Sequence, residues 1–148
     1  VFRDGKECEV SVPIARLPSS DDRRLLMWAG LVLRQTPRCI LERCGAAAAK
    51  ALLALGPGRG VFVQHVLGGS PADTRELCMQ CFLLELDGRP VRELEDVLRA
   101  LEATAAAPSA EPGASETAAG GRRWVRLRLM DPHGHEHVRA LRCDPLYF

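Results

Sequence analysis

Two cysteines and three histidines are of the residue types that could hold a metal ion or a redox couple. Cys78 and Cys81 have a C-x-x-C spacing, and His133, His135 and His137 alternate along one run near the C-terminus. A structural zinc ion needs four converging ligands, but this pattern supplies one cysteine pair whose partners would come from a distant segment. Cysteines between apolar residues usually only pack. We therefore expect no metal and no cofactor, and keep a zinc site as an alternative that elemental analysis would detect.

Ser70 and His65 are of the types used in nucleophilic catalysis. A catalytic serine needs a histidine and an acid nearby, often on a sharp strand-to-helix turn. Here Pro71 follows Ser70 directly and Asp73 comes three residues later, which is the pattern of a helix N-cap. The segment GPGRG (56–60) lacks the Lys-Ser/Thr of a phosphate-binding loop. We therefore predict no catalytic residues in this chain.

Length, charge and cysteine usage limit the class of protein. The 148 residues suit one domain, and a formal net charge of +1 gives no basic excess of the kind that nucleic-acid binding requires. No apolar run reaches the roughly 18 residues of a membrane span. The six cysteines are spread through apolar segments, unlike the dense cysteines of small secreted scaffolds. We expect reduced thiols in an intracellular protein that binds neither nucleic acid nor membrane.

The N-terminal half predicts a hairpin, a linker and two strands on either side of a helical region. Asp4-Gly5 is a strong two-residue turn signal, so residues 1–12 should form a hairpin. The polar stretch 13–24, with prolines near both ends, indicates a linker. Strands are expected over MWAGLVL (27–33) and GVFVQHVL (60–67), separated by a short helix after Pro37 and an Ala-rich stretch, Ala46–Leu55, of uncertain order.

The C-terminal half predicts a second helix and a closing hairpin. CFLLEL (81–86) reads as a buried strand that ends at the Asp87-Gly88 turn. Residues 90–103 place Leu94, Val97, Leu98 and Leu101 on one stripe at helical spacing. Every residue from 104 to 121 is Ala, Ser, Thr, Gly, Pro or Glu, which predicts a flexible insertion. The hairpin is expected from RRWVRLRLM (122–130) and HVRALRC (137–143), joined by the turn DPHGHE.

Gly30 interrupts the apolar strand at residues 27–33. Glycine weakens a strand unless the backbone bends there or is approached closely. A bend with glycine can present a row of free N–H groups to a carboxylate, and the strand edge beyond it can accept an extended peptide. A β-bulge without any ligand is the alternative for this stretch taken alone.

Taken in order, these segments resemble a PDZ domain of the HtrA/Deg (DegP-like) serine proteases. MWAGLVLRQTP is similar to the carboxylate-binding loop and strand, GVFVQHVLGGSPA to the next strand and its Gly-Ser-Pro-Ala turn, LLELDGRPV to the following strand and turn, and RELEDVLRAL to the helix of the binding groove. RRWVRLRLMDPHGHEHVRAL with LYF is similar to the closing hairpin and tail of the large duplicated enzymes of fungal nuclei and plant chloroplasts. RDGKECEVSVP resembles the end of a preceding PDZ domain. The chain departs from the family at Glu76, where a glycine is common, and in its Ala-rich stretches.

The resemblance implies an α+β, PDZ-like small, partly open β-barrel or sandwich of five to six strands with two helices. It would span residues 25–148 with a disordered insertion at about 104–121, after the end of a preceding domain (1–12) and a linker (13–24). The family's catalytic residues belong to another domain, so this chain is not expected to be an enzyme, although its parent protein would be a serine endopeptidase. The family also implies a location in the nucleus or the chloroplast.

The implied function is peptide binding, with protein C-termini as partners and substrate recruitment or regulation as the purpose. Other domains of the parent protease and a second copy of the chain are further expected partners. The alternative is a non-binding scaffold whose groove is closed by its own chain. On this interpretation Gly30→Val abolishes binding and leaves the fold largely intact, and Arg23 or Arg24 assists the carboxylate. The implied peptide-binding residues are Trp28, Ala29, Gly30, Leu31, Val32, Leu33, Leu94, Val97, Leu98 and Leu101.

Overall fold

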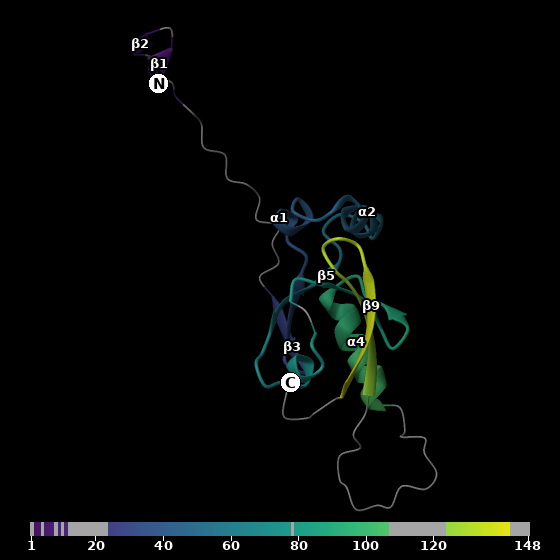
Figure 1. Cartoon of the computed structure of the whole chain (residues 1–148). Coiled ribbons are helices and arrows are strands. Elements are labelled where there is room, and N and C mark those ends of the chain that lie inside the picture. Colours follow the sequence, from purple (N-terminus) through teal and green to yellow (C-terminus); the bar gives the residue numbers. More distant parts are fainter. Residues whose placement is uncertain are drawn as a thin grey trace, which may run out of the picture.

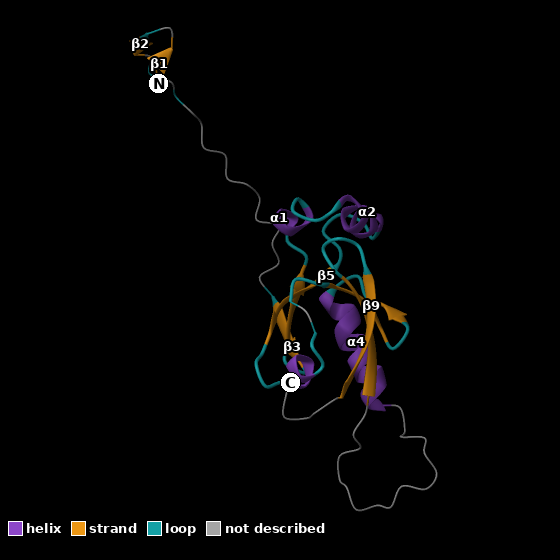
Figure 2. Ribbon diagram, viewed as in Figure 1, coloured by secondary structure: helices purple, strands orange, loops and turns teal. Residues whose placement is uncertain are grey.

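The computed structural model describes residues 2–3, 5–7, 9, 11, 24–77, 79–106 and 124–142 of the chain. The main element within them is one seven-stranded antiparallel sheet of order β3-β4-β5-β6-β8-β9, in which β7 also pairs with β6 (Figures 1 and 2). The strands are β3 (Leu25–Trp28), β4 (Leu31–Gln35), β5 (Val61–Val66), β6 (Phe82–Leu86), β7 (Arg89–Pro90), β8 (Trp124–Met130) and β9 (Glu136–Arg142). An open antiparallel sheet with two main helices is a PDZ-like arrangement, so the predicted fold class is confirmed.

The main helices are α2 and α4, and the other two helices are single turns. The helices found in the described residues are α1 (Arg38–Leu41), α2 (Ala46–Ala54), α3 (Pro71–Thr74) and α4 (Leu94–Ala106). The Ala-rich stretch of uncertain order is therefore helical as α2. The helix α4 begins where Asp96 Oδ2 accepts hydrogen bonds from the backbone N–H groups of Arg92 and Glu93, at 2.9 and 3.1 Å. It continues to Ala106, into the segment assigned to the insertion, and residues 107–123 lie outside the described residues.

The predicted N-terminal hairpin is present as a separate two-stranded sheet. β1 (Phe2–Arg3) pairs antiparallel with β2 (Lys6–Glu7), and Gly5 between them has a φ of +71°. The predicted turn at residues 87–88 is also confirmed, because Asp87 and Gly88 have φ of +50° and +76° and β6 pairs with β7 across them. The linker 13–24 lies almost entirely outside the described residues, so the domain boundaries remain predictions.

The sheet carries apolar side chains on both faces, and a different helix covers each face. Successive strand residues point to opposite faces. Leu83 and Leu129 join the core cluster that includes Leu94, Val97 and Ala100 of α4, whereas their neighbours Phe82 and Met130 join the cluster that includes Ala48 and Leu52 of α2. The last hairpin, β8–β9, therefore contributes to both cores.

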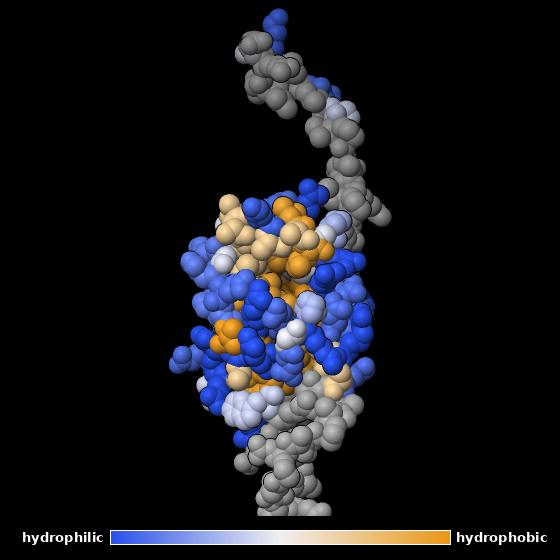
Figure 3. All heavy atoms as spheres, turned by 90° about the vertical axis from the view of Figure 1, so that its right-hand side faces the viewer, coloured by the Kyte–Doolittle hydropathy of each residue, from blue (hydrophilic) through white to orange (hydrophobic). Residues whose placement is uncertain are grey.

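The turn between β8 and β9 also contacts the α2 region. The Gly45 N–H donates to Pro132 O at 2.8 Å, and a Cβ at Gly134 would stand 2.7 Å from Ala47 Cβ. The outward side of α2 forms part of an apolar surface at this end of the molecule, where Leu53 is 65% exposed (Figure 3). None of the described helices combines the length and apolar character needed to cross a membrane.

Among the described cysteines, the expectation of reduced thiols is wrong at one position. Cys81 is disulfide-bonded, while Cys39 and Cys44 are free. Cys78 lies outside the described residues. The intracellular location inferred from reduced thiols thus stays a prediction without this support.

Candidate functional site

The stretch around Gly30 forms a tight hairpin instead of one bent strand. Ala29 and Gly30 have φ of +51° and +85°, and this pair of left-handed residues makes the two-residue turn whose twist suits a hairpin. Trp28 pairs with Leu31 next to the turn, and the pairing continues to Leu25 and Arg34. The prediction of a single strand over 27–33 is therefore wrong. The residues before and after the turn belong to β3 and β4.

The group that approaches Gly30 closely is a side chain of the same protein. A Cβ at Gly30 would lie 2.1 Å from both Cβ and Oγ of Ser70, which is fully buried. The turn's carbonyl groups are held from the same side, since Leu67 N–H donates to Gly30 O at 2.8 Å and Ala72 N–H to Ala29 O at 3.1 Å. The forecast that Gly30→Val leaves the fold largely intact is thus wrong, because any side chain there collides with Ser70.

Ser70 acts as the helix cap that its sequence context predicts. Its Oγ accepts a hydrogen bond from Asp73 N–H at 3.2 Å, and Asp73 Oδ2 accepts one from Gly69 N–H at 2.8 Å. Pro71 occupies the first turn of α3. Glu76, just after this helix, has a φ of +53° and so keeps the left-handed conformation that a glycine would adopt more easily.

The strand β4 has no free edge. On one side it pairs with β3, and on the other with β5, where Leu31, Val32 and Leu33 face Val66, His65 and Val63. The expected arrangement, in which a peptide adds directly beside Leu31–Leu33, is therefore not available while β3 is in place. Within the part of the chain that the structure describes, the sheet ends at β3.

The side chains of β3 alternate between the core and solvent. Trp28 is 5% exposed and Leu26 is half-buried against the main core cluster, whereas Leu25 and Met27 are 57% and 49% exposed. An edge strand whose alternate residues enter a core has the side-chain pattern of an extended peptide bound by strand addition.

The helix α4 contributes three of its four predicted site residues to the same core, together with Ala100, which was not predicted. Leu94, Val97 and Ala100 are buried in the cluster that contains Trp28, Leu31 and Leu33, and Leu101 packs against its edge. The structure thus brings these predicted residues together around β3 and β4. The predicted residues Leu98 and Val32 lie outside this core: Leu98 is 44% exposed, and Val32 is half-buried on the face that it shares with Met27.

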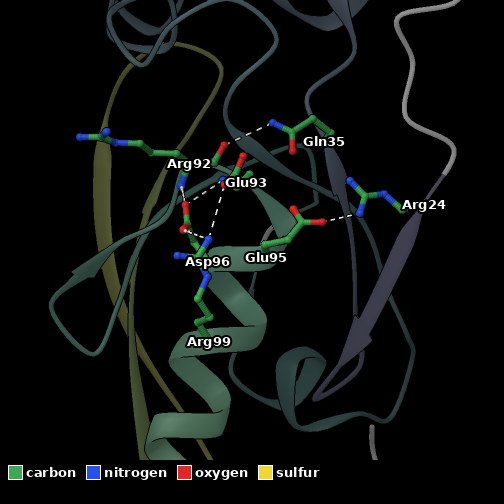
Figure 4. A network of polar contacts seen from close by, with 7 residues as sticks. All are labelled: Arg24, Gln35, Arg92, Glu93, Glu95, Asp96 and Arg99. Carbon is green, nitrogen blue, oxygen red and sulfur yellow. Dashed lines mark hydrogen bonds and ion pairs between the residues drawn. The ribbon is translucent and has the colours of Figure 1, made fainter.

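A polar network joins the start of α4 to the neighbouring strands (Figure 4). Arg24 Nη1, just before β3, pairs with Glu95 Oε1 in the first turn of α4. Gln35 Nε2, at the end of β4, donates to Arg92 O at 3.2 Å. The contribution of Gln35 and Glu95 was not predicted, because both are ordinary polar residues whose partners lie far away in sequence. Arg23 lies outside the described residues.

The histidine-containing turn is organised by Asp131. Its carboxylate accepts hydrogen bonds from the backbone N–H groups of His133 and His135, at 2.8 and 2.9 Å, and contacts His135 Nδ1 at 2.9 Å. Burial acts to raise the pKa of Asp131, but these hydrogen bonds outweigh it and hold that pKa well below its usual range. Within the described parts of the chain, no three His, Cys, Asp or Glu side chains are placed to hold a metal ion.

Comparison with known proteins adds a structural likeness only. No family model matches the chain, and no curated protein matches it. Among solved structures, the chain is similar to the HtrA3 PDZ domain bound to a phage-derived ligand (FGRWV), with a TM-score of 0.46 and 14% sequence identity over 82% of this chain and 88% of that chain. The fold is PDZ-like. This description rests on the sheet order and the two main helices set out above.

Proposed function

We propose that this chain is a PDZ-like interaction module that binds extended apolar segments, including hydrophobic C-termini, at the end of the sheet beside α4. The observation that carries this proposal is the way β3 lies against β4 and α4. Four residues of extended chain lie along β4, and they place alternate side chains in a core shared with α4. Main-chain pairing supplies affinity in this mode of recognition, and the alternate side chains supply selectivity.

The test is a binding measurement with the full chain. Short fluorescent peptides with free apolar C-termini are titrated by fluorescence anisotropy, and peptides of equal length with Asp and Ser at the apolar positions serve as controls. We expect weak but saturable binding, on the order of micromolar, because ordering an extended peptide offsets much of the contact energy. Equal binding of apolar and polar peptides, or no binding of either, contradicts the proposal.

A second candidate function is a closed scaffold between domains or copies of the parent protein. It is favoured by one observation: β4 is paired on both edges, so the strand that would receive a peptide is covered by β3. Light scattering over a wide concentration range separates the two functions. Assembly that increases with concentration, together with the absence of any peptide binder, supports the scaffold.

We further propose that the module belongs to a serine protease of the HtrA/Deg type, on the sequence resemblance described first. In such a protein the module recruits or regulates substrates, and catalysis belongs to another domain in the nucleus or the chloroplast. The test is the complete coding sequence: a trypsin-like domain upstream, with its serine present, supports this assignment.

A further inference from the structure

We propose that β3 is an exchangeable internal ligand, and that external ligands bind by replacing it with a segment of the same pattern. That pattern is a basic residue, an apolar residue two positions later, and an aromatic residue two positions after that, as in Arg24, Leu26 and Trp28. This inference rests on the proposed function, because it specifies how the same site is closed and which peptides open it.

The pairing geometry supports replacement instead of addition outside β3. β3 runs antiparallel to β4, with Leu26 opposite Leu33 and Trp28 opposite Leu31. Cross-strand partners share a face of the sheet, and both Leu33 and Leu31 are fully buried. A segment in this register therefore reaches the core with its alternate residues. A peptide added beyond β3 would have no such access while Trp28 is in place.

The carboxylate of Glu95 explains why the pattern begins with a basic residue. Glu95 pairs with Arg24, whereas the neighbouring Asp96 holds the backbone at the start of α4 and pairs with Arg99 at 3.1 Å. Glu95 is thus the carboxylate that faces an incoming chain at this position. The side chains of Arg24 and Glu95 are 63% and 39% exposed, so the ion pair is screened by solvent and holds β3 only weakly.

Two features make β3 replaceable. It is short, with four residues, and among the described residues it pairs with β4 alone. Two of its side chains, Leu25 and Met27, are largely exposed and lose little when the strand leaves. The buried part of β3 is mainly Trp28 with the inner side of Leu26. A ligand with the same two residue types restores these contacts, so the exchange costs little free energy.

A reversible disulfide lock tests this inference in the full chain. Met27 and Val32 are cross-strand partners one step from the pair that flanks the turn. They therefore form a non-hydrogen-bonded pair with a Cα separation of about 4.5 Å, within the range that a disulfide bridges. The double variant Met27→Cys/Val32→Cys is prepared oxidised and reduced, and mass spectrometry verifies the new bond. The unsubstituted chain under the same two conditions controls for effects on the native cysteines.

The probe is the fluorescent peptide Arg-Leu-Leu-Met-Trp, with Glu-Leu-Leu-Met-Trp and Arg-Leu-Leu-Met-Ala as matched controls. We expect the oxidised variant to bind the probe at least about tenfold more weakly than the reduced variant, and both control peptides to bind the reduced variant more weakly than the probe. The unsubstituted chain should bind equally in both conditions. Undiminished binding to the oxidised variant overturns replacement and leaves the proposed function standing. Absence of binding to every form overturns the proposed function as well.

Discussion

The contact between Gly30 and Ser70 predicts that Gly30→Ala strongly destabilises the fold. Two costs add at this position. A left-handed alanine costs roughly 1–2 kcal/mol relative to glycine. A Cβ only 2.1 Å from two atoms of buried Ser70 forces the turn or the start of α3 to move, and such overpacking costs about 1–3 kcal/mol. The sum, roughly 2–5 kcal/mol, is a large part of the 5–15 kcal/mol that stabilises a typical domain.

Urea unfolding followed by circular dichroism measures this cost, and Gly88→Ala is the matched control. Gly88 is also the second residue of a two-residue hairpin turn and has a φ of +76°, but a Cβ there meets nothing within 4 Å. The control should therefore lose only the conformational part, about 1–2 kcal/mol. Equal losses in the two variants would refute the claim that Ser70 is what requires glycine at position 30.

A compensating substitution sharpens the test. Ser70→Gly removes the Cβ and Oγ that collide with the new methyl group, and glycine replaces serine at an N-cap for only a few tenths of a kcal/mol. The double variant Gly30→Ala/Ser70→Gly should therefore regain about 1–3 kcal/mol relative to Gly30→Ala. Simple additivity of the two single effects would show that the residues do not interact.

Three further predictions concern stability. Glu76→Gly should raise the free energy of unfolding by about 1 kcal/mol, because the backbone of Glu76 is left-handed and its side chain is exposed. An unchanged urea midpoint contradicts this. Leu52→Ala should cost about 2–5 kcal/mol and Leu53→Ala much less, since these neighbours in α2 are 1% and 65% exposed; similar melting temperatures for the two variants would disprove the docking of α2. The pKa of Asp131 is lower in the folded chain than in the unfolded chain, so its stabilising effect is complete above about pH 4 and is lost as the pH falls further. Asp131→Asn should accordingly flatten the dependence of melting temperature on pH below that value, and an equally steep dependence in the variant argues against the role given to Asp131.

The sequence was informative wherever local physical chemistry decides the structure. The Ser70-Pro71 helix start and the Asp87-Gly88 turn depend on a few neighbouring residues, and both were predicted correctly. The amphipathic helix was also identified, because its apolar stripe reports the face that packs. The structure extends it to Ala106, since an alanine-rich stretch favours helix even when its composition suggests an insertion.

The site itself was harder to predict, because its decisive contacts join distant residues. Nothing near Gly30 in the sequence indicates that Ser70 will lie against it, and nothing near Arg24 indicates Glu95. The apolar run across 27–33 also hid the turn, since Ala29 is an unusual residue at a left-handed position. As a consequence, several residues expected around a bound peptide share one core, but their binding role stays a prediction, and the strand that lies among them was taken as part of β4.

The position of β8 between β6 and β9 has a consequence for synthesis on the ribosome. β6 cannot pair with β8 until residues 124–130 have been translated. β8 in turn pairs with β9, which ends at Arg142. Both apolar faces of the sheet, including the one beneath α2, stay incomplete until then. The aromatic residues Phe62 and Phe82 therefore stay open to chaperones until the last hairpin has emerged, because β8 and β9 complete the cores that these residues enter.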